Sequence, residues 1–232
     1  MSTALPPPTA AQVRSQTDPE DEEQQHYKHM LHALQLADKC IPTTTAFCVG
    51  CTIYTQSSPS SLLSTGYSRE LPGNTHAEQC ALDKIVDGLC LSSEKTGEGE
   101  GEGEGKDVVR LDLYTTMEPC SKRASDPQGC AQRIIAFNSS SHVLRSSSVK
   151  RLRIERVFQG VREPTDFQLC EGQRLLREAG VEVLTVLPPP GESAGGREWL
   201  EGECLRIAKK GHADEAAAPA EDVVRLWKDA VF

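Results

Sequence analysis

The order of helical and strand-like segments along the chain restricts its fold more than any other feature. Residues 20–39 repeat apolar side chains at helical spacing. An apolar and β-branched run, 46–54, is followed by a Ser- and Pro-rich turn and by residues 62–66, which can return as the second strand of a hairpin. Helical and strand-like segments then alternate, in the order helix 78–89, strand 108–116, helix 131–137, strand 153–160, helix 167–179 and strand 180–187. This order predicts an α/β fold in three layers, α/β/α, with a mixed sheet of about five strands between two layers of helices.

Low-complexity segments separate one expected domain, residues 21–187, from two tails. The first 20 residues are Pro- and Ala-rich and then acidic, which predicts a disordered lead-in. Within the domain, residues 94–106 are of low complexity, with Gly and Glu alternating over 97–105, and this composition favours a flexible surface loop. Three prolines followed by Gly and Ser open a C-terminal extension, 188–232, in which we expect two short helices, at 197–210 and 221–232.

Composition and charge exclude several classes of protein. The chain carries 25 Lys and Arg against 34 Asp and Glu, a formal net charge of -9, so it lacks the excess of cations that binds nucleic acids. It contains no apolar run long enough to span a membrane and no apolar stretch of a signal peptide near its N-terminus. Its nine cysteines are scattered through apolar segments, which is typical of free thiols or metal ligands. We expect a cytoplasmic protein, with the nucleus as an additional compartment, and neither a membrane nor a nucleic-acid partner.

Two short segments carry side chains suited to bind a metal and to move protons. THAEQC contains His76 and Glu78, and TTMEPCSKRASDPQGC contains Cys120 and Cys130. Zinc deaminases share a His-x-Glu triplet followed later by Pro-Cys-x-x-Cys. The first triplet and Cys120 fit this signature, but nine residues instead of two separate Cys120 from Cys130.

The chemistry of these residue types explains the pattern. One imidazole and two thiolates, from His76, Cys120 and Cys130, give zinc three protein ligands and leave the fourth position to water, as in catalytic zinc sites. Zinc lowers the pKa of such a water to about 7. Glu78, two residues after the first ligand, is then placed as the general acid and base. A single cysteine is more often a buried core residue than a ligand, so the prediction of about one zinc per chain rests on the joint pattern.

At these residues the chain resembles the cytidine-deaminase-like superfamily, over about residues 21–187. The stretch TTMEPCSKRASDPQGCAQRI is similar to the pyrimidine deaminase of riboflavin biosynthesis, which has a long insertion between its two cysteines. GYSRELPGNTHAEQCAL is similar to the fungal form of that enzyme. The resemblance implies a cytidine-deaminase-like fold and a homodimer. It implies that zinc-bound hydroxide converts 2,5-diamino-6-(ribitylamino)-4(3H)-pyrimidinone 5'-phosphate to 5-amino-6-(ribitylamino)uracil 5'-phosphate and ammonia.

Six residues are nominated as contacts for this phosphorylated pyrimidine. The resemblance implies Ser68, Arg69 and Glu70, on the loop before the His-x-Glu helix, where related deaminases hold the ring, and Ser121, Lys122 and Arg123 directly follow Cys120. Cationic donors of this kind suit a phosphate group. For the three cations, an ordinary solvated surface position is an equal alternative.

Other functions share the same metal ligands. A cytidine, deoxycytidylate or tRNA-adenosine deaminase would use the same residues, but these families separate the two cysteines by only two residues. A non-enzyme alternative is an inactive deaminase-like binding subunit. Such subunits typically lack the glutamate of the His-x-Glu triplet, whereas Glu78 is present.

Overall fold

The computed structural model describes residues 19–91, 108–123, 128–140, 143–145, 149–162, 171–189 and 196–212. The predicted lead-in up to residue 18, the Gly-Glu segment and the helix expected at 221–232 lie outside these residues. The described elements are α1 (Pro19–Asp38), β1 (Gly50–Thr55), β2 (Leu62–Tyr67), α2 (Ala77–Leu91), β3 (Val108–Met117), α3 (Cys130–Ser139), β4 (Val143–Arg145), β5 (Val149–Val161), α4 (Gly172–Glu178), β6 (Glu182–Thr185) and α5 (Gly196–Ala208).

One mixed sheet forms the middle of the protein. Its strands lie in the order β2-β1-β3-β5, and β5 also pairs with the short strands β4 and β6. Strands β2, β1 and β3 are antiparallel neighbours, whereas β3, β5 and β6 run parallel to one another. The predicted mixed sheet is confirmed, but its described part has six strands instead of about five. The additional strand, β4, has only three residues and lies in a Ser-rich segment whose composition does not favour a strand.

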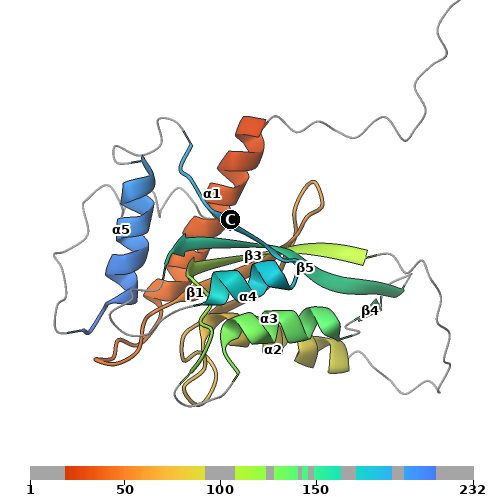
Figure 1. Cartoon of the computed structure of the whole chain (residues 1–232), viewed down its shortest axis with the longest axis horizontal. Coiled ribbons are helices and arrows are strands. Elements are labelled where there is room, and N and C mark those ends of the chain that lie inside the picture. The colour runs from red at the N-terminus through yellow and green to blue at the C-terminus, as the bar shows by residue number, and fades with distance from the viewer. Residues whose placement is uncertain are drawn as a thin grey trace, which may run out of the picture.

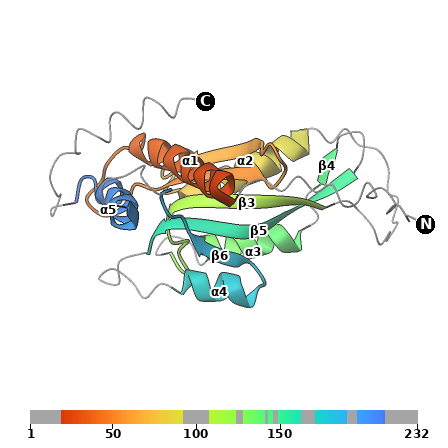
Figure 2. The same cartoon turned by 90° about the horizontal axis from the view of Figure 1, so that it is seen from above.

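Helices cover both faces of the sheet (Figure 1). On one face, α2, α3 and α4 share a core with strand residues such as Ile53 and Leu113. On the other face, α1 and α5 pack against Tyr54 and Tyr114, the next residues along the same strands. Successive side chains of a strand point to opposite faces, so both faces of β1 and β3 are buried. Figure 2 shows α1 and α4 on opposite sides of β5, and the three-layer α/β/α architecture is confirmed.

The helix predicted at 197–210 in the C-terminal extension is present as α5 and packs on the same core as α1. Its buried residues include Leu200, Cys204 and Ile207. The Cys48 N–H donates a hydrogen bond of 2.9 Å to the carbonyl oxygen of Ala208, at the end of α5. The first helix of the extension therefore belongs to the three-layer structure.

The start of α2 lies very close to strand β2. A Cβ atom on Gly66 would lie 2.1 Å from the carbonyl oxygen of Ala77, so only glycine allows this approach. One turn later, the Ser64 hydroxyl donates a hydrogen bond of 2.7 Å to the carbonyl oxygen of Ala81. These two contacts hold the first turns of α2, which directly follow His76, against the sheet.

Three histidines of α1 are packed among aromatic side chains of the sheet. The His29 ring stacks on Tyr54 with 3.6 Å between ring centroids, and His26 accepts or donates a hydrogen bond of 2.6 Å with the Tyr114 hydroxyl. Burial lowers the pKa of His29 from 6.5 to about 3, and it also lowers the pKa values of His26 and His32. The folded protein therefore holds these imidazoles in the neutral form.

The buried histidines predict a loss of stability in acid. Between pH 6.5 and about 3 the unfolded chain binds a proton on His29 while the folded protein does not, so the free energy of unfolding falls as the pH falls through this range. The substitution His29→Phe keeps an aromatic ring against Tyr54 and removes one such proton. Urea unfolding between pH 6.5 and 4 is expected to show a slope against pH that is shallower in the variant, by up to about 1.4 kcal/mol per pH unit. The metal site is the same in both proteins, so its contribution cancels. Equal slopes would contradict the assignment.

Candidate metal centre

Three side chains from distant parts of the sequence meet at one end of the sheet. Nδ1 of His76 lies 3.5 Å from Sγ of Cys120 and 3.4 Å from Sγ of Cys130. The three ligand atoms all lie within 4.8 Å of one another, and both cysteines are buried while His76 is partly exposed. Among the described residues, no other group of three or more His, Cys, Asp or Glu side chains is arranged to hold a metal.

The fold places these ligands beside the starts of two helices. His76 directly precedes α2, and its carbonyl oxygen accepts a hydrogen bond from the Cys80 N–H in the first helical turn. Cys130 is the first residue of α3, and Cys120 lies between β3 and α3. Two hydrogen bonds close this loop, from the Ala131 N–H to the Cys120 carbonyl oxygen and from the Cys130 N–H to the Cys120 sulfur. The helices predicted at 78–89 and 131–137 are confirmed as α2 and α3, and each begins one residue earlier than predicted.

The donor set fits a zinc ion. A tetrahedral zinc with bonds of about 2.3 Å to sulfur and about 2.1 Å to nitrogen places its ligand atoms roughly 3.6 Å apart, close to the two distances given above. The hydrogen bond from the Cys130 thiol is the main reason why the pKa of Cys120 lies below its usual value, and His76 lowers this pKa further. The two sulfur atoms thus share one proton, and a metal cation bound between them can replace this proton.

Glu78 lies next to these ligands without belonging to the group. Its side chain is in the first turn of α2 and only 3% exposed. Burial raises the pKa of its carboxyl group, the Cys120 sulfur raises it further, and His76 opposes the rise. The Thr115 hydroxyl lies 3.1 Å from its Oε1. A buried carboxyl group with a raised pKa beside a metal centre is suited to exchange protons.

The three nominated residues in front of α2 have partners within the protein. Ser68 is buried and hydrogen-bonds the backbone just before β1. The Arg69 guanidinium donates hydrogen bonds of 2.8 and 3.3 Å to two carbonyl oxygens of the loop 41–47. The Glu70 carboxylate accepts a hydrogen bond of 2.6 Å from the Lys84 ammonium. The structure thus ties these side chains to neighbouring segments of the same chain.

The three nominated residues after Cys120 differ from one another. Ser121 is buried, and its hydroxyl accepts a hydrogen bond of 3.2 Å from the backbone N–H just before α4. Arg123 donates hydrogen bonds of 2.6 Å to the Asn74 carbonyl oxygen and 2.9 Å to Oε1 of Gln79. It therefore bridges the two segments that carry the ligands, on either side of His76. Lys122 is exposed.

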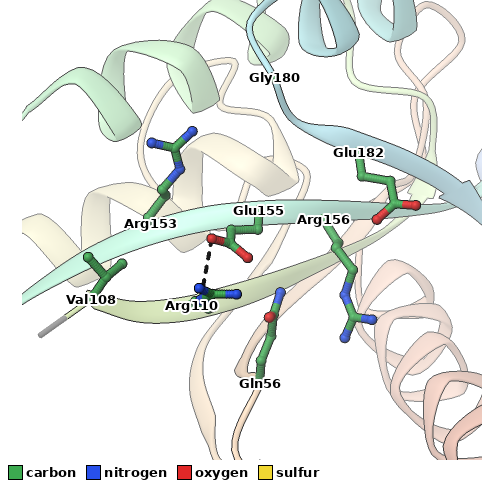
Figure 3. A pocket seen from close by; sticks show the side chains of 8 residues that line it. All are labelled: Gln56, Val108, Arg110, Arg153, Glu155, Arg156, Gly180 and Glu182. Carbon is green, nitrogen blue, oxygen red and sulfur yellow. Dashed lines mark ion pairs between the residues drawn. The ribbon is translucent and has the colours of Figure 1, made fainter.

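A separate cleft of about 490 Å³ opens at the other end of β3 (Figure 3). Its charges are of both signs and largely paired. Arg110 lies 3.6 Å from Glu155, and Arg156 donates two hydrogen bonds, of 2.7 and 2.6 Å, to the buried Asp112 carboxylate. Because the cleft lies at the start of β3 whereas Cys120 follows the end of β3, it is not part of the metal centre.

Thr115 is a site residue that the sequence analysis missed. It lies on β3 opposite Cys51, and two residues after Leu113, which is in the core under α2. The period of two along a strand was the available signal, since it places Thr115 on the face that carries Glu78. A threonine in a strand is so common that the pattern alone did not single it out.

The geometry predicts that zinc binding depends on all three ligands. The variants His76→Ala, Cys120→Ser and Cys130→Ser should each bind far less zinc than the wild type, which should hold about one ion per chain. Cys204→Ala is the matched control, because this buried thiol lies on the α1 side of the sheet. Metal analysis of the purified proteins measures this. Full zinc occupancy in a ligand variant, or its loss in the control, would contradict the assigned ligands.

Comparisons with known proteins agree with this geometry. Residues 23–145 match the family described as the cytidine and deoxycytidylate deaminase zinc-binding region. The chain is 37% identical over 187 residues to the diaminohydroxyphosphoribosylamino-pyrimidine deaminase of Schizosaccharomyces pombe, a match that covers 81% of this chain. The matched part is 36% of that protein, so this chain spans about a third of its relative's length.

Solved structures show the same architecture. The Rib2 deaminase of Aspergillus oryzae, as a C-terminal deletion mutant, is 30% identical with a TM-score of 0.58, and the match covers 89% of this chain and 99% of that chain. The same enzyme in complex with DARIPP has a TM-score of 0.58 at 29% identity, with the same coverage. A deaminase/reductase from Thermotoga maritima, at 20% identity and a TM-score of 0.53, covers 81% of this chain and 40% of that chain and shows the shared fold alone.

Among the described residues, every helix is too short or too polar to cross a bilayer.

The family match covers more than half of the chain and contains the His76 and Cys120 motifs as well as Cys130. The chain therefore belongs to the cytidine and deoxycytidylate deaminase family of zinc-binding proteins.

Proposed function

We propose that this protein is the zinc-dependent hydrolytic deaminase of riboflavin biosynthesis. It converts 2,5-diamino-6-(ribitylamino)-4(3H)-pyrimidinone 5'-phosphate and water to 5-amino-6-(ribitylamino)uracil 5'-phosphate and ammonia. The observation that carries the proposal is the convergence of His76, Cys120 and Cys130 beside the buried Glu78. The similarity to the S. pombe and A. oryzae deaminases supports the choice of substrate over cytidine and deoxycytidylate.

Each residue of the centre has a distinct role in this reaction. His76, Cys120 and Cys130 hold zinc, which supplies a Lewis acid that acidifies water at neutral pH. Glu78 would accept a proton from the attacking water and deliver it to the ring nitrogen, and would then move the proton of the newly added hydroxyl group to the amine, which departs as ammonia. The burial of Glu78 favours this role, because a carboxylate removed from water accepts a proton more readily.

The six nominated residues differ in how they can contribute to substrate binding. Lys122 is the best placed of the six nominated side chains to bind the phosphate, because it is exposed and cationic and lies two residues after a metal ligand. The internal partners of Arg69 and Arg123 favour a role in shaping the loops around the substrate. From the family resemblance we also propose that the protein forms a homodimer and is located in the cytoplasm.

The substrate assignment predicts the outcome of a panel assay. Ammonia release from the ribitylamino-pyrimidinone phosphate should be much faster than from its dephosphorylated form, from cytidine or from deoxycytidylate. A coupled ammonia assay under identical conditions compares kcat/KM for the four compounds. A preference for cytidine would overturn the pathway assignment while leaving the zinc chemistry intact.

The assignment of Glu78 predicts a separation of metal binding from turnover. Glu78→Gln keeps the shape of the side chain and removes its ability to carry a proton, so zinc should stay bound while kcat falls by at least roughly a hundredfold. Glu203→Gln is the matched control, because this glutamate is 6% exposed and lies on α5, away from the ligands. Zinc analysis and steady-state kinetics on both variants provide the measurement. An active Glu78→Gln protein would refute the proton-transfer role.

A further inference from the structure

We propose that Thr115 is a positioning residue whose hydroxyl fixes the carboxylate of Glu78 in the orientation required for proton transfer. The inference rests on the proposed deaminase function and adds a residue to its machinery. It concerns a side chain of the sheet, on an element that carries none of the metal ligands or Glu78.

The Thr115 hydroxyl has two hydrogen-bond partners. Its hydroxyl oxygen lies 3.1 Å from Oε1 of Glu78 and 3.0 Å from the carbonyl oxygen of Met117. Both atoms are acceptors, and a hydroxyl group has a single proton to donate. The hydroxyl proton of Thr115 is therefore shared between the Glu78 carboxylate and the carbonyl oxygen at the end of β3. This shared contact links the carboxylate to the strand.

The neighbouring strands hold the Thr115 side chain in a fixed position. Thr115 is 0% exposed in the central strand β3, between Cys51 of β1 and Gln159 of β5. A β-branched side chain in a strand has few accessible rotamers. Its hydroxyl is consequently held at a fixed point of the sheet, while Glu78 belongs to α2. The hydrogen bond sets the carboxylate relative to the sheet from which the loop with Cys120 emerges.

Within the described part of the chain, the hydroxyl of Thr115 is the side-chain donor that lies within hydrogen-bond distance of the Glu78 carboxylate. Removing this hydroxyl therefore removes the contact that ties the carboxylate to the sheet.

A set of threonine variants tests the inference. Thr115→Val keeps the branched shape and loses the hydroxyl, and Thr115→Ser keeps the hydroxyl and loses the methyl group. We expect kcat to fall roughly 10- to 100-fold in the valine variant, as for the loss of one hydrogen bond to a charged group, with KM and zinc content unchanged. The serine variant should recover kcat to within about threefold of wild type.

Thr52→Val is the matched control. Thr52 is also fully buried in the sheet, but its hydroxyl donates to the His29 carbonyl oxygen at 3.4 Å, on the face covered by α1. This variant should keep the wild-type kcat. If the valine variant at position 115 does not fold, which thermal unfolding reveals, Thr115→Ala against Thr115→Ser gives the same comparison.

The possible outcomes separate this inference from the proposed function. A wild-type kcat in Thr115→Val, or a serine variant as slow as the valine variant, overturns the positioning role while the deaminase function stands. Loss of zinc in Thr115→Val shows a role in maintaining the metal centre and also overturns the inference. A zinc-loaded wild type that releases no ammonia from any compound of the panel overturns the proposed function and, with it, this inference.

Discussion

The metal centre depends on the pairing of β3 between β1 and β5. This central strand is buried on both faces over most of its length, with Leu113 on the side of α2 and Tyr114 on the side of α1. Its end leads directly into the loop that carries Cys120, and its neighbour β1 brings β2 and then α2 alongside. His76 is far from the two cysteines in the sequence, so the three ligands meet only once this ladder has formed. The site is thus a product of the tertiary fold, and burial of apolar side chains on both faces of β3 is what holds it together.

The two faces of the sheet carry different kinds of polar groups. The face under α2 and α3 holds the metal-binding group and Glu78, where burial and close sulfur atoms shift the pKa values of Glu78 and Cys120. The face under α1 holds neutral histidines against tyrosine rings and the Asp112–Arg156 ion pair. That second network has no side chain in the metal centre. Its contribution is to the stability of the strand that both faces share.

Local patterns predicted most of the fold, and the motif predicted the composition of the metal centre. Alternation along β3 and helical spacing in α1 and α2 are visible in the sequence, because each element buries one face or both. The partners of Arg69 and Arg123 could not be predicted in the same way. Arg69 reaches a loop more than 20 residues earlier, and Arg123 reaches across to Asn74, so both contacts depend on how distant segments pack. Thr115 required the strand register as well as the motif.

The central claim is that His76, Cys120 and Cys130 bind a catalytic zinc whose fourth position is open to water. The most direct measurement is an anomalous difference map from crystals of the purified protein, recorded on both sides of the zinc absorption edge. We expect a single strong peak bonded to Nδ1 of His76 and to both sulfurs, with a non-protein fourth ligand next to Glu78. A peak elsewhere would contradict the assigned ligands, and a fourth ligand supplied by the protein would contradict the catalytic role, because a closed site of that kind is structural.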